Sequence, residues 1–184
     1  FPPGHKKRDV NLDPVVRDEA ELARAVYVQY EDVGTFGQGV YPSAAKPGIV
    51  WLTSPGAIKA LDTRNLTPET RIKSWPVVGP GEKLPGVPAG SVDTRMHDVI
   101  EHQGKVIVCE MATSAVVVFD PATGKYERHM VPRYAENVQT HTAYPDSKGN
   151  IWFNSKKGAS RLYKLDMATK KITEYNPVKG ANWY

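Results

Sequence analysis

The stretch His141–Tyr175 reads HTAYPDSKGNIWFNSKKGASRLYKLDMATKKITEY, and it decides the fold. It holds three apolar runs of strand length, at 151–153, 162–165 and 172–175, which are separated by clusters of Gly, Asn, Ser, Asp and Lys. Such clusters supply turn chemistry, and no helix fits between the runs. The stretch therefore predicts a small sheet whose strands follow one another along the chain.

The same order of features occurs upstream, in the stretch His97–Val131, which reads HDVIEHQGKVIVCEMATSAVVVFDPATGKYERHMV. Both stretches begin with a histidine, have a glycine before the second strand and place an aspartate after the third. The interval from Gly104 to Asp120 is 16 positions, and that from Gly149 to Asp166 is 17. We therefore expect two equivalent hairpins, repeated with the 46-position period that separates the two aspartates.

A third and less regular copy, GIVWLTSPGAIKALD, spans Gly48–Asp62. Trp51 stands in this copy where Trp152 stands in the last one, and we expect both indoles to wedge between blades as core rather than stack on a ligand. The Pro/Gly-rich run 79–92 follows and is interpreted as a surface insertion on one rim. Repeats of about 40–50 residues with four short strands each are typical of β-propeller blades, although hairpins of another all-β fold are the alternative.

The string HTAYPDSKGNIWFNS, followed by RLYKLDMATKKITEY, resembles the repeat of the virginiamycin B lyase (streptogramin lyase) family. The NHL-like and gluconolactonase-like propellers have related repeats. In the lyase family a histidine precedes a D-x-x-G turn and an apolar-Trp-Phe strand. The resemblance covers about residues 37–178 and implies an all-β propeller of four-stranded antiparallel blades. It specifies a fold more than a function, because propellers of this type serve many chemistries.

The repeats divide the chain into two parts. Residues 1–36 are expected to form an arm over 1–13, which packs outside its own blades or is poorly ordered, and then a short helix that gives way to a strand near Ala25. Residues 37–184 hold the blades. Closed rings have about 4–8 blades, so we expect a partial propeller that missing sequence or a partner chain completes. The three copies span 37–78, 97–132 and 141–178.

Composition excludes several classes of function. The chain has 24 Lys and Arg against 20 Asp and Glu, and the basic run at 156–179 is interpreted as a solvated strand face rather than a phosphate-binding patch. We expect neither nucleic-acid binding nor a membrane span, because no aromatic ladder and no run of roughly 18 apolar residues occurs. The single cysteine, Cys109, is expected to be a small buried hydrophobe. No C-x-x-C-H, Walker or G-x-S-x-G motif supports attached haem, nucleotide hydrolysis or α/β-hydrolase chemistry.

Two histidines, His97 and His141, hold equivalent positions at the start of the innermost strands of consecutive blades. In a propeller these strand starts line the mouth of the central channel, so residues far apart in sequence converge there. Convergent imidazoles suit a metal ion or a general base. We also expect Glu110 to point the same way. His102, in a turn, and His129, on an outer strand, are expected at the surface.

The family resemblance implies roles for these residues. In the lyase-like repeat a histidine and a glutamate stand as His97 and Glu110 do here. That histidine acts as a general base or acid, and a divalent cation, magnesium in the lyase, polarises the ester carbonyl. The resemblance thus implies His97, His141 and Glu110 as catalytic residues and as ligands of Mg²⁺ or another divalent cation. In the third copy Ser155 occupies the carboxylate position, so Glu110 is the only acid of the set.

Two functions follow. The first is a binding or accessory module of a larger exported protein or assembly, in which the histidines are structural groups that hydrogen-bond to neighbouring blades. The second is a lyase-like enzyme that acts on a polar or cyclic ester substrate at the channel mouth. The missing blades and the few carboxylates favour the module slightly. The expected partners are the remaining propeller sequence or another chain, and a small polar substrate; the family implies a periplasmic or extracellular location.

Overall fold

The computed structural model describes residues 30, 37–65, 67–157 and 161–175. The chain divides into two compact units, Phe1–Glu31 and Asp32–Tyr184, and every described strand belongs to the second. The predicted arm at 1–13 and the predicted helix after it lie outside the described residues.

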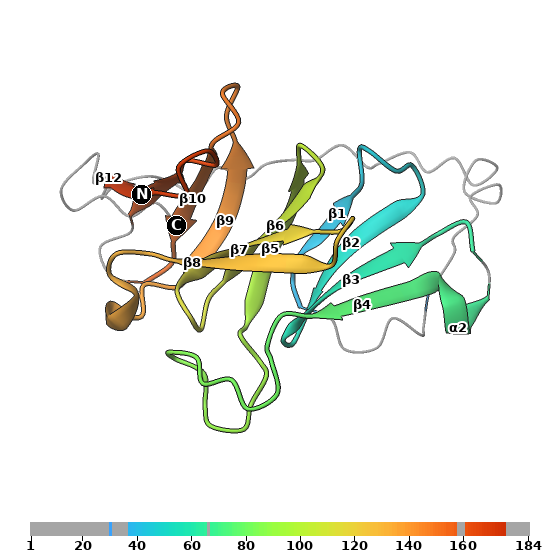
Figure 1. Cartoon of the computed structure of the whole chain (residues 1–184), viewed down its shortest axis with the longest axis horizontal. Coiled ribbons are helices and arrows are strands. Elements are labelled where there is room, and N and C mark those ends of the chain that lie inside the picture. The colour runs from blue at the N-terminus through green and yellow to red at the C-terminus, as the bar shows by residue number, and fades with distance from the viewer. Residues whose placement is uncertain (1–29, 31–36, 66, 158–160, 176–184) are drawn as a thin grey trace, which may run out of the picture. The chain divides into compact units, whose positions relative to one another are not determined.

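The second unit contains three four-stranded antiparallel sheets, each formed by strands consecutive in sequence (Figure 1). The sequence-based prediction of an all-β propeller is therefore confirmed. Blade 1 consists of β1 (Val40–Pro42), β2 (Ile49–Ser54), β3 (Ala57–Asp62) and β4 (Ile72–Pro76), with the short helix α2 (Pro68–Arg71) before β4. Blade 2 consists of β5 (Met96–His102), β6 (Lys105–Glu110), β7 (Ala115–Asp120) and β8 (Lys125–Met130). The 3₁₀ helix η2 (Tyr134–Glu136) leads to blade 3, which consists of β9 (Thr140–Pro145), β10 (Ile151–Ser155), β11 (Leu162–Leu165) and β12 (Ile172–Tyr175).

The two predicted hairpins are equivalent in the structure. In blade 2, Ile107 pairs with Val118, and in blade 3, Trp152 pairs with Lys164 at the same register position. The preceding Gly104 has a φ of +72° and Gly149 one of +84°, a backbone region that favours glycine in these turns.

An aspartate stands at the end of the third strand in blades 1 and 2 and directly after it in blade 3, and it starts the next turn. One carboxylate oxygen accepts a hydrogen bond from the backbone N–H two residues later, at 3.0 Å in each of the three blades. This is the Asx turn that Asp favours at such positions. The three bonds are Asp62 to Arg64, Asp120 to Ala122 and Asp166 to Ala168. The repeat is therefore encoded as much by its turns as by its apolar runs.

Blades 1 and 2 bury a common core. Trp51 is only 3% exposed, and its ring centroid lies 6.3 Å from that of Phe119 in blade 2. The indole Nε1 of Trp51 donates a 2.8 Å hydrogen bond to Glu101 Oε2 on β5, so this side chain joins the two sheets by packing and by polarity. The expectation that Trp51 is inter-blade core is confirmed. Its apolar neighbours include Ile58, Val99, Val106, Val108 and Val117.

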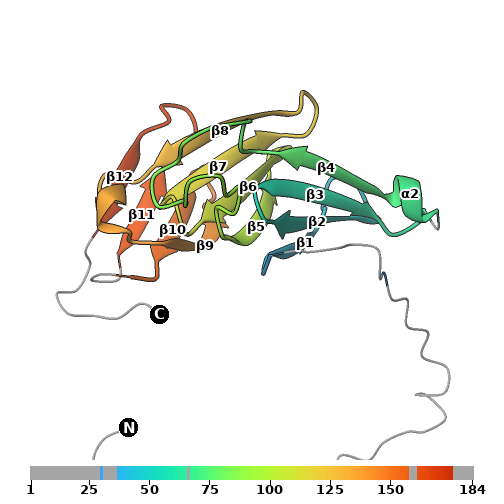
Figure 2. The same ribbon diagram turned by 90° about the horizontal axis from the view of Figure 1, so that it is seen from below.

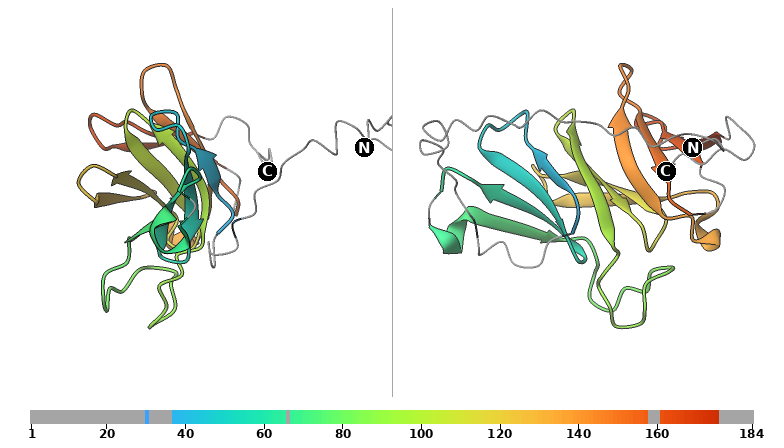
Figure 3. Two further views of the ribbon diagram at one scale, coloured as in Figure 1. Left: turned by 90° about the vertical axis from the view of Figure 1, so that its right-hand side faces the viewer. Right: turned by 180° about the vertical axis from the view of Figure 1, so that it is seen from behind.

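A second core lies between blades 2 and 3. Phe153 and Tyr163 stack with centroids 5.3 Å apart, and Ile107 of blade 2 belongs to the same cluster. Cys109 is fully buried here, as predicted, and burial raises the pKa of its thiol well above the ordinary value. Figures 2 and 3 show the three sheets in succession, with their innermost strands β1, β5 and β9 next to one another.

Trp152 departs from the prediction that it is buried between blades. Its register position matches that of Trp51, so its ring lies on the face of blade 3 that points away from blade 2. The ring is partly buried, lies 5.1 Å from the Tyr175 ring and donates a hydrogen bond to Asp146 Oδ2. The next residue on this face, Tyr144, is 72% exposed. Trp152 therefore occupies the predicted position in the repeat. It is not buried between blades because the described structure has no further blade against this face.

Candidate functional site

His97 and His141 occupy equivalent bulges in the inner strands of blades 2 and 3. Pairing of β5 with β6 shifts register between Met96 and Val99, so two residues, His97 and Asp98, stand opposite one. Pairing of β9 with β10 shifts in the same way at His141 and Thr142. A bulge turns a side chain out of the regular alternation, and bulges are frequent next to active sites. The same irregularity in both blades therefore aims both imidazoles at one place.

The structure brings these two histidines together. Their ring centroids are 3.6 Å apart, with an angle of 31° between the ring planes. The inner strands are also tied directly, because the Ala143 N–H donates a 2.9 Å hydrogen bond to Asp98 Oδ2. His141 Nδ1 lies 3.0 Å from Thr142 Oγ1, whereas His97 Nδ1 is buried without a hydrogen-bond partner among the described residues. Thr142 thus orients the His141 ring, whereas the Nδ1 atom of His97 lacks a hydrogen-bond partner among the described residues.

Both imidazoles favour their neutral forms. Burial is the main cause that lowers the pKa of His97 and of His141 below the ordinary value. For His141, the nearby ring of His97 and the charge of Lys156 lower the pKa further. A hydrogen bond with the His141 backbone and, to a smaller extent, the charge of Asp98 oppose the lowering of the His97 pKa, and burial raises the pKa of the Asp98 carboxyl group. Near neutral pH the site therefore presents two uncharged rings beside a lysine.

Glu110 does not join the histidines, contrary to expectation. Its side chain is fully buried and accepts 2.7 Å and 3.2 Å hydrogen bonds from the Arg128 guanidinium and a 2.8 Å bond from Thr113 Oγ1. Arg128 also donates to the Val77 carbonyl oxygen, at the start of the loop that leaves blade 1. Within the part of the chain that the structure describes, no three His, Cys, Asp or Glu side chains are grouped to hold a metal ion.

The other two described histidines are less exposed than predicted. His102 and His129 are both partly buried, and the Nε2 atom of His102 is buried without a hydrogen-bond partner among the described residues. His129 Nε2 lies 3.4 Å from Glu127 Oε2, two residues earlier on the outer strand of blade 2. Neither residue lies at an inner-strand bulge, so neither belongs to the candidate site.

A cavity of about 350 Å³ opens at the same end of the blades, and we call it the mouth cavity. Its wall includes Met96, the residue before His97, and Lys156, whose charge lowers the pKa of both histidines. Equivalent positions of all three blades contribute to it, each directly after the second strand: Pro55, Met111 and Lys156. The other lining residues are Gly37, Gln38, Ser54, Asp93 and Arg95.

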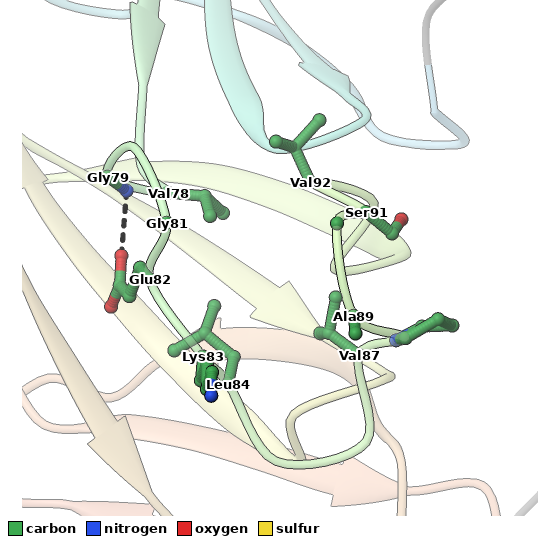
Figure 4. Close-up of a pocket in the computed structure, with 12 residues that line it drawn as sticks. Val78, Gly79, Gly81, Glu82, Lys83, Leu84, Val87, Ala89, Ser91 and Val92 are labelled. Carbon is green, nitrogen blue, oxygen red and sulfur yellow. Dashed lines mark hydrogen bonds between the residues drawn. The ribbon is translucent and has the colours of Figure 1, made fainter.

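A second cavity, of about 390 Å³, lies inside the loop 79–92 (Figure 4). Its walls are mainly apolar side chains of the loop, including Val78, Leu84, Val87 and Val92. The one carboxylate in its wall, Glu82, accepts hydrogen bonds from the Gly79 N–H and from Arg128. Neither His97 nor His141 lines either cavity, but Lys156, whose charge acts on both histidines, lies in the wall of the mouth cavity. The mouth cavity is therefore the better candidate for chemistry or polar recognition.

The positions of Arg95 and Gln139 before the two histidines were visible in the sequence, but their backbone conformation and the place of Lys156 in the cavity wall were missed. Arg95 and Gln139 each stand two residues before a site histidine, and both have positive φ, +52° and +57°. Their carbonyl oxygens accept hydrogen bonds from Met111 and Lys156, which fixes the rim of blades 2 and 3 alike. The signal for Lys156 was its place directly after Ser155, the position equivalent to Glu110. To recognise this signal, one must know which residues of the three blades are equivalent, and the strand pairing in the structure shows this.

No known family model matches this sequence, and no curated protein matches it. Solved structures do match. Streptogramin B lyase superposes with a TM-score of 0.60 at 22% sequence identity, over 77% of this chain and 41% of the lyase chain. The extracellular domain of a one component system from B. thetaiotaomicron superposes with a TM-score of 0.55 at 13% identity, over 80% of this chain and 18% of that one. Hydrazine synthase from Kuenenia stuttgartiensis gives 0.53 at 11% identity, over 80% and 38% of the respective chains.

These likenesses concern the fold, because sequence identity is low throughout. The chain spans about two fifths of the length of streptogramin B lyase. None of the helices that the structure describes has the length and apolar composition that a membrane crossing requires. With its three consecutive antiparallel blades and these structural neighbours, the chain has the β-propeller fold of streptogramin B lyase.

Proposed function

We propose that this chain is a propeller module that binds a small polar molecule at the mouth of its blades, within a larger exported protein or assembly. The observation that carries the proposal is the convergence of His97 and His141, 3.6 Å apart, from equivalent bulges of two blades. A concave site with a few convergent polar groups is the usual form of a small-molecule site. The adjoining mouth cavity supplies the space.

The divalent cation that the family resemblance implies does not fit these residues. Glu110, the only carboxylate of the expected ligand set, is neutralised by Arg128 in a buried ion pair. The positive charge of Lys156 acts on both histidines and would repel a cation beside them. No catalytic step is therefore assigned to a metal ion here, and recognition in place of metal-assisted chemistry is the function that the site supports best.

The rest of the ring is proposed to come from further propeller sequence or from another chain. The three blades that the structure describes are fewer than closed rings contain, and the outer face of blade 3 carries Trp152 and the exposed Tyr144. The likeness to an extracellular domain supports a periplasmic or extracellular location for the whole assembly.

A lyase-like enzyme is the second candidate, and one observation favours it. Burial keeps His97 neutral near pH 7, and its Nδ1 atom has no hydrogen-bond partner among the described residues. A neutral imidazole can accept a proton from the carbon that neighbours the alkoxy carbon of the ester and carries a second carbonyl group. The bond between the alkoxy carbon and the ester oxygen then breaks, a C=C bond forms between the two carbons, and the ester oxygen leaves as part of a carboxylate. Such a reaction would need stabilisation of the enolate, which Arg95 or Lys156 of the mouth cavity would have to supply.

An assay of ester opening separates the two candidates. The protein is incubated with streptogramin B, with and without added Mg²⁺, and linearised product is measured by mass spectrometry. We expect no turnover above the buffer control under either condition, because the carboxylate needed to hold the cation is bound to Arg128. Turnover that disappears in the His141→Ala variant would instead establish the enzyme and reject the binding module.

A further inference from the structure

Two cationic side chains line the mouth cavity. Arg95, before β5, and Lys156, after β10, come from different blades, yet both lie in the wall of the same 350 Å³ cavity. Asp93 is the only acidic residue among the described residues that line it, and its Oδ1 atom accepts a 2.8 Å hydrogen bond from the Arg95 backbone N–H. The cavity wall therefore carries a net positive charge.

Hydrogen bonds fix the main chain at both cationic residues. The aspartate contact and the positive φ of +52° fix the Arg95 main chain, and its carbonyl oxygen accepts a 3.1 Å bond from Met111. Lys156 is held in the same way, because its N–H donates a 2.8 Å bond to the Gln139 carbonyl oxygen. A residue other than glycine at positive φ is uncommon and is often found at binding sites, where neighbouring contacts impose it.

The Arg95 side chain has capacity for a ligand. Its guanidinium makes no ion pair with any residue that the structure describes, and the residue is exposed. A guanidinium presents a planar fork that matches a carboxylate or a phosphate group, and lysine adds a compact point charge. Met96 and Met111 supply apolar wall beside these polar groups. The composition suits a small molecule that has an anionic group on a less polar body.

We propose that the mouth cavity binds the anionic group of a small molecule, a carboxylate or a phosphate, between Arg95 and Lys156, with His97 and His141 beside it. This inference rests on the proposed binding function and specifies its ligand class. It also reverses the charge expected at this mouth from the family resemblance, since a site built on Arg95 and Lys156 attracts an anion where a lyase-like site would hold a cation.

Calorimetric titration of the full chain tests this proposal. Inorganic phosphate and citrate are titrated separately, so that the two arms identify which anionic group is preferred. We expect saturable binding of at least one. The Arg95→Gln and Lys156→Gln variants should each weaken it by roughly ten-fold or more, because each removes one charge-assisted hydrogen bond. Added sodium chloride should also weaken binding.

The Lys148→Gln variant is the matched control. It removes one positive charge from the turn after β9, at the end of that strand opposite to His141, and Lys148 is exposed. We expect unchanged affinity in this variant and unchanged thermal unfolding in all three. Equal weakening by Lys148→Gln would mean that anions associate with the basic surface in general, and the site would be rejected. Binding of neither anion would also reject it, whereas turnover of streptogramin B is a separate result that would reject the binding module.

Discussion

The Arg128→Ala variant is expected to lose about 3–5 kcal/mol of unfolding free energy, the typical cost of breaking a buried ion pair on one side. Glu110 is fully buried, and the Arg128 side chain is only 9% exposed. Removing the guanidinium deletes the 2.7 Å and 3.2 Å hydrogen bonds and leaves the carboxylate with the Thr113 hydroxyl as its remaining side-chain partner. It also frees the Val77 carbonyl oxygen and Glu82, so the loop 79–92 should detach from blade 2.

Urea denaturation at neutral pH measures this loss, with Arg133→Ala as its control. Arg133 pairs with Glu136 at 3.1 Å and with Glu174 at 3.6 Å, but its own side chain is 48% exposed, so we expect a change of about 0–1 kcal/mol. A loss at Arg128 no larger than at Arg133 would show that Glu110 and Arg128 do not pair in solution. The Glu110 carboxylate would then not be neutralised by Arg128, and the argument against a cation site would lose its main support.

The second large effect is a difference between two tryptophans at equivalent positions. Trp51→Ala should cost about 3–5 kcal/mol, because it leaves a cavity between blades 1 and 2 and removes the hydrogen bond to Glu101. Trp152→Ala should cost much less, on the order of 1–2 kcal/mol, because the ring is only partly buried and its main polar partner is Asp146 in its own blade.

The same denaturation experiment compares these two variants at matched protein concentration. Size-exclusion chromatography of both proteins serves as the control for association. A loss at Trp152 as large as that at Trp51 would mean that the outer face of blade 3 is already buried in the isolated protein. This face could then not receive further propeller sequence or another chain, and the proposal that it does would be rejected.

The fold could be predicted from the sequence because its signals are local. Asp62, Asp120 and Asp166 each start an Asx turn, and their spacing defines the repeat before any long-range contact is known. The convergence of His97 and His141 followed from the same repeat, since equivalent strand starts of adjacent blades lie at one end. The bulges that bring the rings into contact were not visible, because a bulge depends on how two strands pair.

The direction of the Glu110 side chain could not be predicted for a different reason. In β6 the side chains alternate between the two faces of the blade, and Glu110 shares a face with Val106 and Val108, which pack toward blade 1. Its partner, Arg128, is 18 residues away on the outer strand and carries no sequence signal that sets it apart from other surface arginines. Whether Glu110 contacts the histidines or Arg128 depends on how side chains pack across the sheet, and a repeat pattern does not encode this packing.

The central claim is that His97 and His141 form one ligand-binding site at the mouth of the blades. The most direct measurement is a pH titration of the histidine ring signals in ¹H–¹⁵N NMR spectra, with and without inorganic phosphate, assigned through the His97→Gln and His141→Gln variants. Because burial lowers both pKa values, the two rings should stay neutral as pH falls through 6.5, where an unperturbed histidine takes up a proton. They should then titrate as a coupled pair, with Asp98 and Lys156 nearby, and phosphate should shift both signals together. Two rings that titrate independently near pH 6.5 and do not respond to phosphate would contradict the claim.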